Sequence, residues 1–330
     1  MTETFKALVL TQEDGRTVST MRNLRDTDLP DGDVLLAVEY SSLNYKDGLA
    51  ITGKGKIVRQ WPLVPGIDLA GRVLESASPD YSAGDNVVLT GWGVGEKYWG
   101  GYSQHQRVQS KWLVPLPAGL DSRRAMAIGT AGFTAMLCVM TLEEAGVTPN
   151  KGPVLVTGAT GGVGSISVAI LHKLGYQVTA VSGKPDAEGF LRDLGATEIL
   201  TRDEMSQPPR PLEGQRWAGA VDTVGSTMLA RVIAETDYNG CVAACGLAGG
   251  FDLPTTVMPF ILRNVSLRGV DSVSCPVERR KQAWQRLVSD LPTRALGEIG
   301  QVASLEQLPE LAEKITTGAI RGRVIVDLNA

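Results

Sequence analysis

Residues 153–164 form the stretch that most constrains how this chain can fold. A short β-branched run, Val154–Thr157, leads into glycines at positions 158, 161, 162 and 164, and an apolar pattern of helical period follows. Glycine permits positive φ in a tight turn and lets another group approach the backbone closely. The order of strand, glycine turn and helix predicts an anion site, because a helix N-terminus presents unpaired N–H groups and the positive end of its dipole.

The glycine spacing alone is a weak signal, and its context strengthens it. The pattern reads Ala159-x-Gly161-x-x-Gly164, with alanine in the first of three glycine slots. The helix stops at Gly175 and a second strand is expected over 177–181, which completes a βαβ unit of about thirty residues. We expect a dinucleotide pyrophosphate here; the alternative is an ordinary glycine-rich turn in a parallel sheet. The residues expected to bind it are Thr160, Gly161, Gly162 and Val163.

Residues 129–270 alternate between expected strands and helices, which is typical of a doubly wound parallel sheet. The strands are expected at 154–157, 177–181, 198–200, 220–223, 240–244 and 266–269, and the helices at 162–174, 186–194, 227–235 and 258–264. The predicted fold class is therefore α/β, with a Rossmann domain over residues 129–270.

Residues 1–128 show short strands separated by Gly, Pro and Asp turns, which suggests a barrel-like or sandwich domain. The strands are expected at 7–10, 34–40, 69–75, 86–89, 104–109 and 113–115, and a helix follows over 121–146. The tail, residues 271–330, is expected to return to this first domain. It should add helices over 277–289 and 305–318 and a strand over 323–328.

Composition limits the partners of this 330-residue chain. A content of 43% hydrophobic and 21% charged residues is ordinary for a soluble globular protein, and a net charge of −4 argues against a nucleic-acid partner. Met1–Leu10 does not resemble a signal peptide, and no apolar segment reaches the roughly 18 residues needed to span a bilayer. We therefore expect a cytoplasmic protein without a membrane partner.

Four cysteines and two histidines offer little catalytic chemistry. Cys241 and Cys245 share a strand-like run, and we expect buried free thiols because two further zinc ligands are not found near them. His105 and His172 lack the Ser, Cys or carboxylate arrangement of a triad. Structural roles are expected for both.

The end of the second strand of the βαβ unit indicates which cofactor is preferred. NAD sites place an acid there, about twenty residues past the glycines, to bind the ribose 2′-OH. Here Ser182, Gly183 and Lys184 follow the strand, and no carboxylate does. A 2′-phosphate would be attracted by these donors, so NADP is favoured over NAD. The alternative for Lys184 is a solvated loop lysine.

Longer runs of sequence resemble one family. The glycine turn, Pro65–Gly71 and the order of β-rich domain, Rossmann domain and tail resemble the medium-chain dehydrogenase/reductase superfamily. More narrowly, runs in five places resemble the NADPH-dependent acrylyl-CoA reductases of its quinone-oxidoreductase branch. These runs are 41–47, 90–95, 128–135, 244–250 and 253–264. The resemblance covers nearly the whole chain and implies NADPH/NADP as the cofactor, a GroES-like catalytic domain over 1–128 and 271–330, and a homodimer.

The resemblance also implies cofactor contacts beyond the glycine turn and the Ser182 segment. Arg202 would lie along the adenine-ribose rim; the alternative is a surface salt bridge with one of the two acids that follow it. Leu247 and Ile261 would flank the nicotinamide, although both are equally plausible as core residues. Ser272 would follow the sixth strand, at the carboxyl edge of the sheet where ligands bind.

The chain departs from the zinc alcohol dehydrogenases at their metal-binding positions. Where their Gly-His-Glu motif supplies a histidine, this chain has Gly66-Ile67-Asp68, and Asn44 lies near the position of their first cysteine ligand. No cysteine-rich lobe occurs between residues 85 and 105. Zinc requires three or four N, S or O ligands, so we expect a zinc-independent protein.

The run Asn44-Tyr45-Lys46-Asp47 is the best candidate for the chemistry that the resemblance implies. Reduction of an α,β-unsaturated thioester requires hydride at the β-carbon, donors that stabilise the enolate oxygen, and a proton at the α-carbon. Tyr45 stays protonated at neutral pH, because the usual pKa of tyrosine is about 10, and can donate. Lys46 could stabilise the enolate, and Asp47 could orient either side chain. The alternative is that Tyr45 packs beside the nicotinamide while Lys46 and Asp47 pair at the surface.

Coenzyme A is polyanionic, so the resemblance also implies a patch of cations where the substrate enters. The candidates are Lys54, Lys56 and Arg59, or Arg321 and Arg323. The alternative is a solvated charged face. The leading interpretation of the whole chain is NADPH-dependent reduction of acrylyl-CoA, a small molecule carried on coenzyme A, to propanoyl-CoA. The rivals are a quinone or alkenal reductase, and a non-catalytic protein that binds NADPH.

Overall fold

The computed structural model describes residues 4–330, so Met1–Glu3 of the segment considered for a signal peptide lie outside the described residues. The chain forms two compact units. The first comprises Met1–Thr130, Ser272–Trp284 and Ile299–Ala330, and the second comprises Ala131–Asp271 and Gln285–Glu298. The sequence-based division gives all of 271–330 to the first domain, so the two divisions differ mainly over Gln285–Glu298, and also at residues 129, 130 and 271.

The second unit contains the predicted doubly wound sheet, and the Rossmann prediction is confirmed. Its six strands pair in parallel in the order β10-β9-β8-β11-β12-β13, the order of dinucleotide-binding sheets. Their bounds are β8 Val154–Val156, β9 Val178–Ser182, β10 Glu198–Thr201, β11 Trp217–Asp222, β12 Thr236–Ala244 and β13 Ser266–Gly269. The central strands are apolar and buried along their length, as strands covered on both faces must be.

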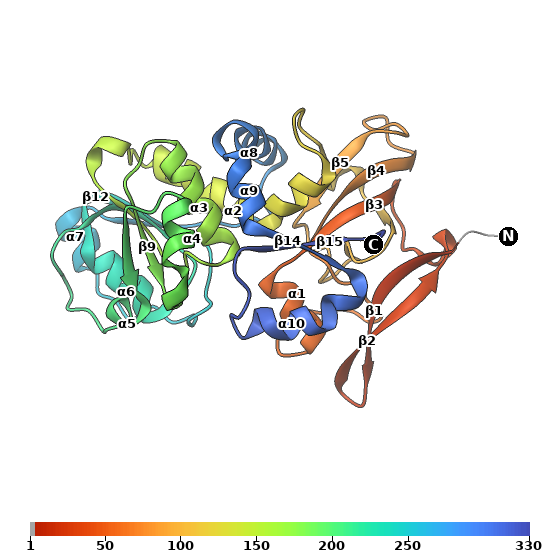
Figure 1. Cartoon of the computed structure of the whole chain (residues 1–330), viewed down its shortest axis with the longest axis horizontal. Coiled ribbons are helices and arrows are strands. Elements are labelled where there is room, and N and C mark those ends of the chain that lie inside the picture. Colours follow the sequence, from red (N-terminus) through yellow and green to blue (C-terminus); the bar gives the residue numbers. More distant parts are fainter. Residues whose placement is uncertain (1–3) are drawn as a thin grey trace. The chain divides into compact units, whose positions relative to one another are not determined.

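Helices follow most of these strands. Their bounds are α3 Gly162–Lys173, α4 Glu188–Asp193, α5 Arg202–Met205, α6 Ser226–Glu235 and α7 Met258–Arg263. Figure 1 shows α3 and α4 beside β9.

The four cysteines are free thiols, as expected from their apolar surroundings.

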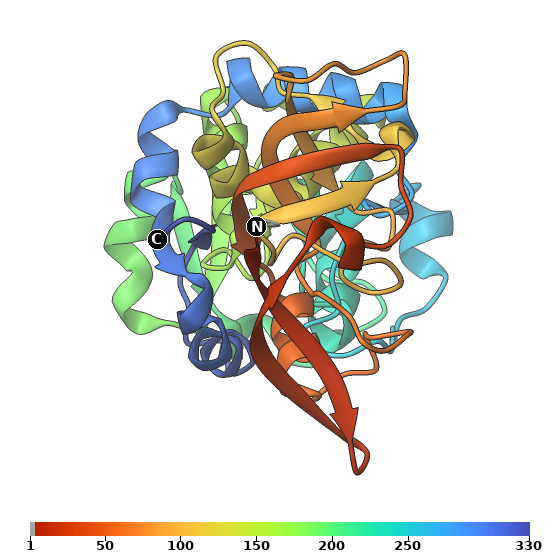
Figure 2. The same cartoon turned by 90° about the vertical axis from the view of Figure 1, so that its right-hand side faces the viewer.

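The first unit is β-rich, as predicted, and its strand pairs are antiparallel except for the parallel pair of β14 and β15. Its main sheet has the order β14-β15-β3-β4-β5-β7, with β6 paired to β3, and β1 and β2 form a separate hairpin. The bounds are β1 Phe5–Glu13, β2 Arg16–Leu24, β3 Val34–Leu43, β4 Asp68–Ser76, β5 Asn86–Thr90, β6 His105–Val108, β7 Val114–Pro115, β14 Gly300–Ser304 and β15 Arg323–Asp327. Figure 2 shows the hairpin as a long two-stranded ribbon with its turn at the free end.

Some elements of the first unit were not expected from the sequence, β2 and the helix that follows β3 among them. β2 is largely polar and lacks a clear period, yet it pairs with β1 from end to end. α1 (Tyr45–Thr52) follows β3 directly and packs against α10 (Leu308–Thr316), side by side in Figure 1. The approach is close, since a Cβ at Gly48 would lie 2.5 Å from the Ile315 side chain. The structure thus makes Asn44–Asp47 the start of a helix.

The helix predicted over 121–146 contains a break. α2 spans Ser122–Glu144, but Gly129 has φ 52° and ψ −159°, so the helical path is interrupted there. The expectation that no segment is long and apolar enough to span a bilayer is also wrong, because α2 passes that test. Its apolar window is almost entirely buried, so α2 is a core helix.

Part of the tail lies in the first unit, where β15 pairs with β3 and β14 with β15, whereas Gln285–Glu298 belongs to the second unit. α8 (Val277–Asp290) is found where a helix was predicted, whereas α9 (Thr293–Ile299) and β14 were not predicted.

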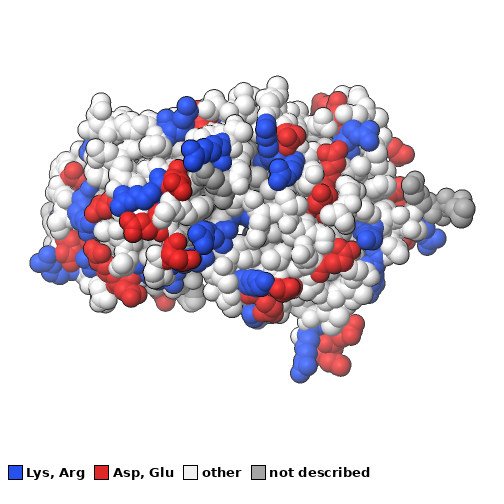
Figure 3. All heavy atoms as spheres, viewed as in Figure 1, with Lys and Arg blue, Asp and Glu red and all other residues white. Residues whose placement is uncertain are grey.

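On the face shown in Figure 3, basic and acidic side chains are interspersed.

Candidate functional site

The turn after β8 is shaped by two glycines. Gly158 has φ 58°, and a Cβ there would lie 2.3 Å from Thr223 Oγ1, so Gly158 makes the tight turn that precedes the alanine slot. A Cβ at Gly164 would lie 2.4 Å from the Gly158 carbonyl oxygen. Helix α3 can therefore begin this close to β8 only with glycine at 164. The glycine at position 164 of the sequence pattern thus marks a close contact between the backbone of α3 and that of the turn after β8.

The first turn of α3 has the features of an anion site. Its N-cap is Gly161, which caps no N–H group with a side chain. The N–H groups of Gly162 and Val163 have no intrahelical acceptor, as in the first turn of any helix. β8 and β11 are the two strands at which the order of the sheet reverses, and ligands of open α/β sheets bind at that point. Thr160, Gly161, Gly162 and Val163 are all at this turn and fit a pyrophosphate.

Ser182, Gly183 and Arg202 meet at the carboxyl ends of β9 and β10. The Arg202 guanidinium lies directly against Gly183, since a Cβ at 183 would be 2.6 Å from Arg202 Nε. Ser182 Oγ accepts a hydrogen bond from the Lys184 N–H at 3.0 Å, so the hydroxyl stays inside this turn. In the described part of the chain Arg202 forms no ion pair with Asp203 or Glu204, so that alternative is not observed. A cation, a hydroxyl and a small residue are thus adjacent, without a carboxylate among them.

Leu247 and Ile261 are not core residues. Their exposed fractions are 64% and 71%, so the core alternative is wrong for both. They belong to a group of exposed apolar side chains between β12 and β13, which we call the 247–262 patch. Its members are Leu247, Phe251, Leu253, Val257, Met258, Ile261 and Leu262.

Ser272 belongs to the first unit, whereas the other predicted cofactor residues except Tyr45 belong to the second. Its carbonyl accepts a hydrogen bond from Arg280 Nη2 at 3.2 Å. Arg280 is buried, donates to the Thr90 carbonyl at 2.7 Å and lies over the Trp92 ring. The hydrogen bonds of Arg280 therefore link the backbone at Ser272 to the end of β5.

Tyr45 and Lys46 lie on the first turn of α1. The Tyr45 side chain is 46% exposed, so its hydroxyl is accessible to a ligand. Lys46 Nζ pairs with Glu96 Oε1 at 2.8 Å, and not with Asp47. The alternative of a surface pair between Lys46 and Asp47 is therefore wrong.

Asp47 is buried and acts on the backbone. Its two oxygens accept hydrogen bonds from the N–H groups of Asn44, at 2.9 Å, and Ile67, at 3.0 Å. The expectation that Asp47 orients the Tyr45 or Lys46 side chain is therefore corrected, because no carboxylate oxygen faces either side chain. Asn44 and Asp47 form a reciprocal capping box, and the spacing Asn44-x-x-Asp47 was the sequence signal for it.

A buried polar network surrounds this cap. Asp68 and Arg323, both almost fully buried, contact the Asn44 side chain at 3.1 and 3.0 Å respectively. Sequence reasoning included Asn44 in the candidate run 44–47 without a role of its own, and it did not select Asp68. It placed Arg323 in a surface patch of cations, which is wrong because the Arg323 guanidinium is enclosed.

The remaining candidates for a cation patch differ in whether their side chains have a partner within the protein. Lys54 pairs with Glu313 at 2.6 Å, while Lys56 and Arg59 are exposed. Arg321 has an interaction partner within the protein. Lys54, Lys56, Arg59 and Arg321 are all exposed, so each of them stays accessible to an anionic ligand, whereas Arg323 does not.

Burial raises the pKa of Asp47 to about 7, and the neighbouring Asp68 adds to the shift. The N–H donors of Asn44 and Ile67 oppose it, because they favour the carboxylate. Burial also lowers the pKa of Arg323, against the attraction of both carboxylates. Two carboxyl groups therefore face one guanidinium inside the first unit.

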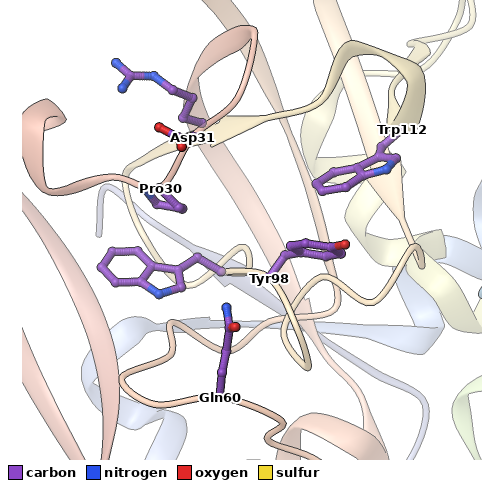
Figure 4. A pocket seen from close by; sticks show the side chains of 7 residues that line it. Pro30, Asp31, Gln60, Tyr98 and Trp112 are labelled. Atoms are coloured by element: carbon purple, nitrogen blue, oxygen red, sulfur yellow. The ribbon is translucent and has the colours of Figure 1, made fainter.

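A small aromatic cavity also lies in the first unit. Figure 4 shows Tyr98 and Trp112 close together, with Pro30 and Asp31 on the other side and Gln60 below; the two rings are 4.7 Å apart. The cavity volume is about 70 Å³. Drug-sized ligands occupy roughly 300–1,000 Å³, and none of the predicted site residues lines this cavity. We do not assign it to the cofactor or the substrate.

We predict a specific pH dependence of stability from Asp47. Its folded-state pKa is about 7 against an ordinary value of 3.8, so the folded state binds the extra proton between these values. Stability should fall as pH rises from 4 to 7, by up to about 4 kcal/mol, and stay level above pH 7. The Asp47→Asn variant lacks this titration.

Denaturant titrations of both proteins at several pH values test this prediction. As pH rises from 4 to 7, the unfolding free energy of wild type should fall relative to that of Asp47→Asn. Groups distant from Asp47 titrate alike in both proteins, so their contributions cancel in the difference. A difference that does not depend on pH would contradict the assignment.

Comparison with known proteins agrees with the architecture and the glycine turn. The family model "Alcohol dehydrogenase GroES-like domain" matches residues 30–118, and "Zinc-binding dehydrogenase" matches residues 162–289. Among the residues that the structure describes, no three His, Cys, Asp or Glu side chains are grouped to hold a metal ion.

Two curated relatives match over nearly the full length. The chain is 59% identical to the probable acrylyl-CoA reductase AcuI of Escherichia coli, over 98% of this chain and 100% of that protein. It is 55% identical to the acrylyl-CoA reductase AcuI of Ruegeria pomeroyi, over 99% and 100%.

A solved structure provides the comparison for the cofactor. The yhdH oxidoreductase of Salmonella enterica, crystallised in complex with NADP, has 59% sequence identity and a TM-score of 0.96, covering 98% of this chain and 99% of that one. Fold, glycine turn and full-length similarity agree, so the chain belongs to the medium-chain dehydrogenase/reductase superfamily, in the group that contains the acrylyl-CoA reductases AcuI.

Proposed function

We propose that this chain is an NADPH-dependent reductase that converts acrylyl-CoA to propanoyl-CoA. The observation that carries the proposal is identity above one half, over nearly the whole chain, to two proteins named for that activity. The glycine turn and the Ser182–Arg202 group support it, because they suit a phosphorylated dinucleotide. Quinone or alkenal reduction is the weaker interpretation.

NADPH, when bound, supplies the hydride for the substrate β-carbon. The first turn of α3 would hold its pyrophosphate with the N–H groups of Gly162 and Val163. Ser182, Lys184 and Arg202 would hold the 2′-phosphate, and Gly183 leaves room for the Arg202 guanidinium. Leu247, Ile261 and Ser272 would lie at the nicotinamide end.

Arg202 provides the test of this cofactor assignment. We expect Arg202→Ala to raise the Kd for NADPH about 10- to 100-fold and that for NADH by less than about twofold, because a charge-assisted phosphate contact is lost. Lys184→Ala should act in the same direction. Fluorescence titration with both cofactors measures the effect, and equal weakening of both would contradict the assignment.

Tyr45 is the proposed donor to the substrate. Its hydroxyl is accessible and its side chain lies on the helix turn that the Asn44–Asp47 cap holds. It can donate to the thioester oxygen, where negative charge develops when hydride arrives at the β-carbon. Proton delivery to the α-carbon requires a donor on the same side, and Tyr45 or a water beside it would serve.

We expect Tyr45→Phe to lower kcat by about 10- to 100-fold while changing the Kd for NADPH by less than about twofold, because only the transition state gains from the donor. Steady-state kinetics and cofactor titration measure the two effects. Tyr238→Phe alters an exposed tyrosine of the second unit and serves as the control. An unchanged kcat for Tyr45→Phe would leave Tyr45 with a packing role.

The oxidation of NADPH, followed with acrylyl-CoA, with a quinone and with no acceptor, tests the proposed function itself. We expect turnover with acrylyl-CoA at least about tenfold faster than with the quinone, a difference of about 1.4 kcal/mol in activation free energy. We also infer that the reaction needs no zinc, because the resemblance aligns Ile67 and the run 43–45 with the histidine and the first cysteine ligand of the zinc alcohol dehydrogenases. Dialysis against a chelator should leave kcat unchanged. Equal rates with both acceptors would remove the thioester assignment.

We also propose that the enzyme is a homodimer, with the 247–262 patch at its interface. The patch exposes seven large apolar side chains beside β13, which is an edge strand of the sheet. Exposed apolar side chains that precede an edge strand in the sequence suit an interface with a second copy of the same chain. The cytoplasmic location and the lack of nucleic-acid and membrane partners stay predictions.

Phe251 is 86% exposed and lies in the patch. We expect Phe251→Glu to convert the dimer to a monomer in sedimentation experiments, because burying a carboxylate in an apolar interface is costly. Lys97→Glu, an exposed change in the first unit, should leave the mass unchanged. A wild-type monomer would refute the dimer.

A further inference from the structure

Asp68 is fully buried at the start of β4 and accepts hydrogen bonds with both oxygens. Its Oδ1 accepts from Ser42 Oγ at 2.8 Å. Its Oδ2 accepts from the Asn44 side-chain NH₂ at 3.1 Å and from the Thr130 N–H at 2.7 Å. One carboxylate thus joins the end of β3, the cap of α1 and the break in α2.

Arg323 holds the same cap from the other direction. Its Nη1 donates to the Asn44 side-chain oxygen at 3.0 Å, and its Nε donates to the Ala127 carbonyl at 3.1 Å. The Asn44 amide is therefore fixed at both ends, its NH₂ on Asp68 and its oxygen on Arg323. Only an amide offers a donor and an acceptor in this geometry.

Gly129 leaves the space for this arrangement. A Cβ there would lie 2.4 Å from Arg323 Nη2 and 2.7 Å from Asp68 Oδ2. The left-handed glycine brings the Thr130 N–H onto the carboxylate, which satisfies a donor that the broken helix leaves unpaired. The break in α2 and the cap of α1 therefore share one acceptor.

We propose that Asp68 is a positioning residue of this reductase, which acts through the Asn44 amide to fix the first turn of α1 and thereby the Tyr45 side chain. The proposal rests on the proposed function, since it takes Tyr45 as the group that meets the substrate. Asp68 touches neither Tyr45 nor Lys46 by any contact in the described structure. Its effect on the reaction is indirect.

The charges around the cap provide a readout that a purely structural residue would not alter. The groups that face Asp47 are Asp68 from β4, Arg323 from β15 and the hydroxyl of buried Tyr102. On the α10 side, Lys54 and Glu313 pair at the other end of α1. Ionised Asp47 accepts the N–H bonds that cap the helix, so activity should rise with pH through its titration. This rise of kcat with pH is the acid limb of the pH profile. Because the charge of Asp68 raises the pKa of Asp47, removal of the Asp68 charge should move the acid limb to lower pH.

The experiment compares kcat, KM and the pH profile of kcat for Asp68→Asn and wild type, using the full-length enzyme. We expect kcat to fall at least about tenfold, KM for NADPH to change by less than about twofold, and the acid limb to move down by about one pH unit or more. A wild-type kcat with an unmoved limb would overturn the proposal. Glu235→Gln is the control: Glu235 is a buried carboxylate bonded to Trp217 and Arg231, and this change should lower Tm without moving the limb.

Asn44→Ala provides a second test that removes no charge and applies even if Asp68→Asn does not fold. If Asp68 acts through Asn44, this variant should lose kcat to a similar degree, and the double variant should be little worse than either single one. Unchanged kcat in Asn44→Ala, or additive losses in the double variant, would overturn the proposal.

Each variant is compared with wild type using the acceptor that wild type reduces. Failure of wild type on acrylyl-CoA would refute the proposed function, whereas normal variants beside an active wild type would refute the role of Asp68.

Discussion

The contact between the start of α3 and the end of β8 is the constraint on which the cofactor site depends. Gly164 lies so close to the Gly158 carbonyl that no Cβ fits, and this closeness brings the open N–H groups of α3 to the edge of the sheet. An anion bound there interacts with backbone groups and the helix dipole. The proposed contacts to the phosphorylated ribose come from side chains at the next two strands, where Gly183 leaves room for the Arg202 guanidinium.

The first unit applies a different kind of constraint. Its cap at Asn44 is held by a buried set of one amide, two carboxyl groups and one guanidinium. Such a set is costly to bury, and it is retained only where every donor and acceptor finds a partner. In return, it gives the first turn of α1 a single arrangement. The role proposed for Tyr45 requires that arrangement, because donors must be aimed at the oxygen before charge develops.

Much of the fold could be predicted from the sequence. The period of the strands and helices in 154–269 and the glycine turn specify a parallel sheet, because each is a local pattern with one physical cause. β2 could not be predicted in this way, since its nine residues are mostly polar and its pairing comes from β1. The break at Gly129 was hidden inside an apolar run of helical period. It exists because Thr130 finds Asp68, which is 62 residues away in sequence.

The candidate site shows the same difference between local sequence patterns and contacts between residues distant in sequence. Thr160–Val163 and Ser182–Lys184 could be proposed from the sequence because a phosphate site is local in sequence. Asp47 was selected for a role toward neighbouring side chains, yet its oxygens face the backbone of Asn44 and Ile67. Arg323 was expected at the surface, because burial of a charge is decided by residues such as Asp68 that are distant in sequence. Asn44-x-x-Asp47 was a local signal for a helix cap that could have been recognised.

The account depends most on hydride passing from the cofactor to the β-carbon of a thioester-conjugated alkene. Wild-type enzyme, acrylyl-CoA and NADPH with deuterium at either face of nicotinamide C4 would test this directly by mass spectrometry and NMR of the product. We predict that one of the two labelled cofactors yields propanoyl-CoA with a single deuterium at the β-carbon. Deuterium at the α-carbon, or an unlabelled product from both cofactors, would contradict it.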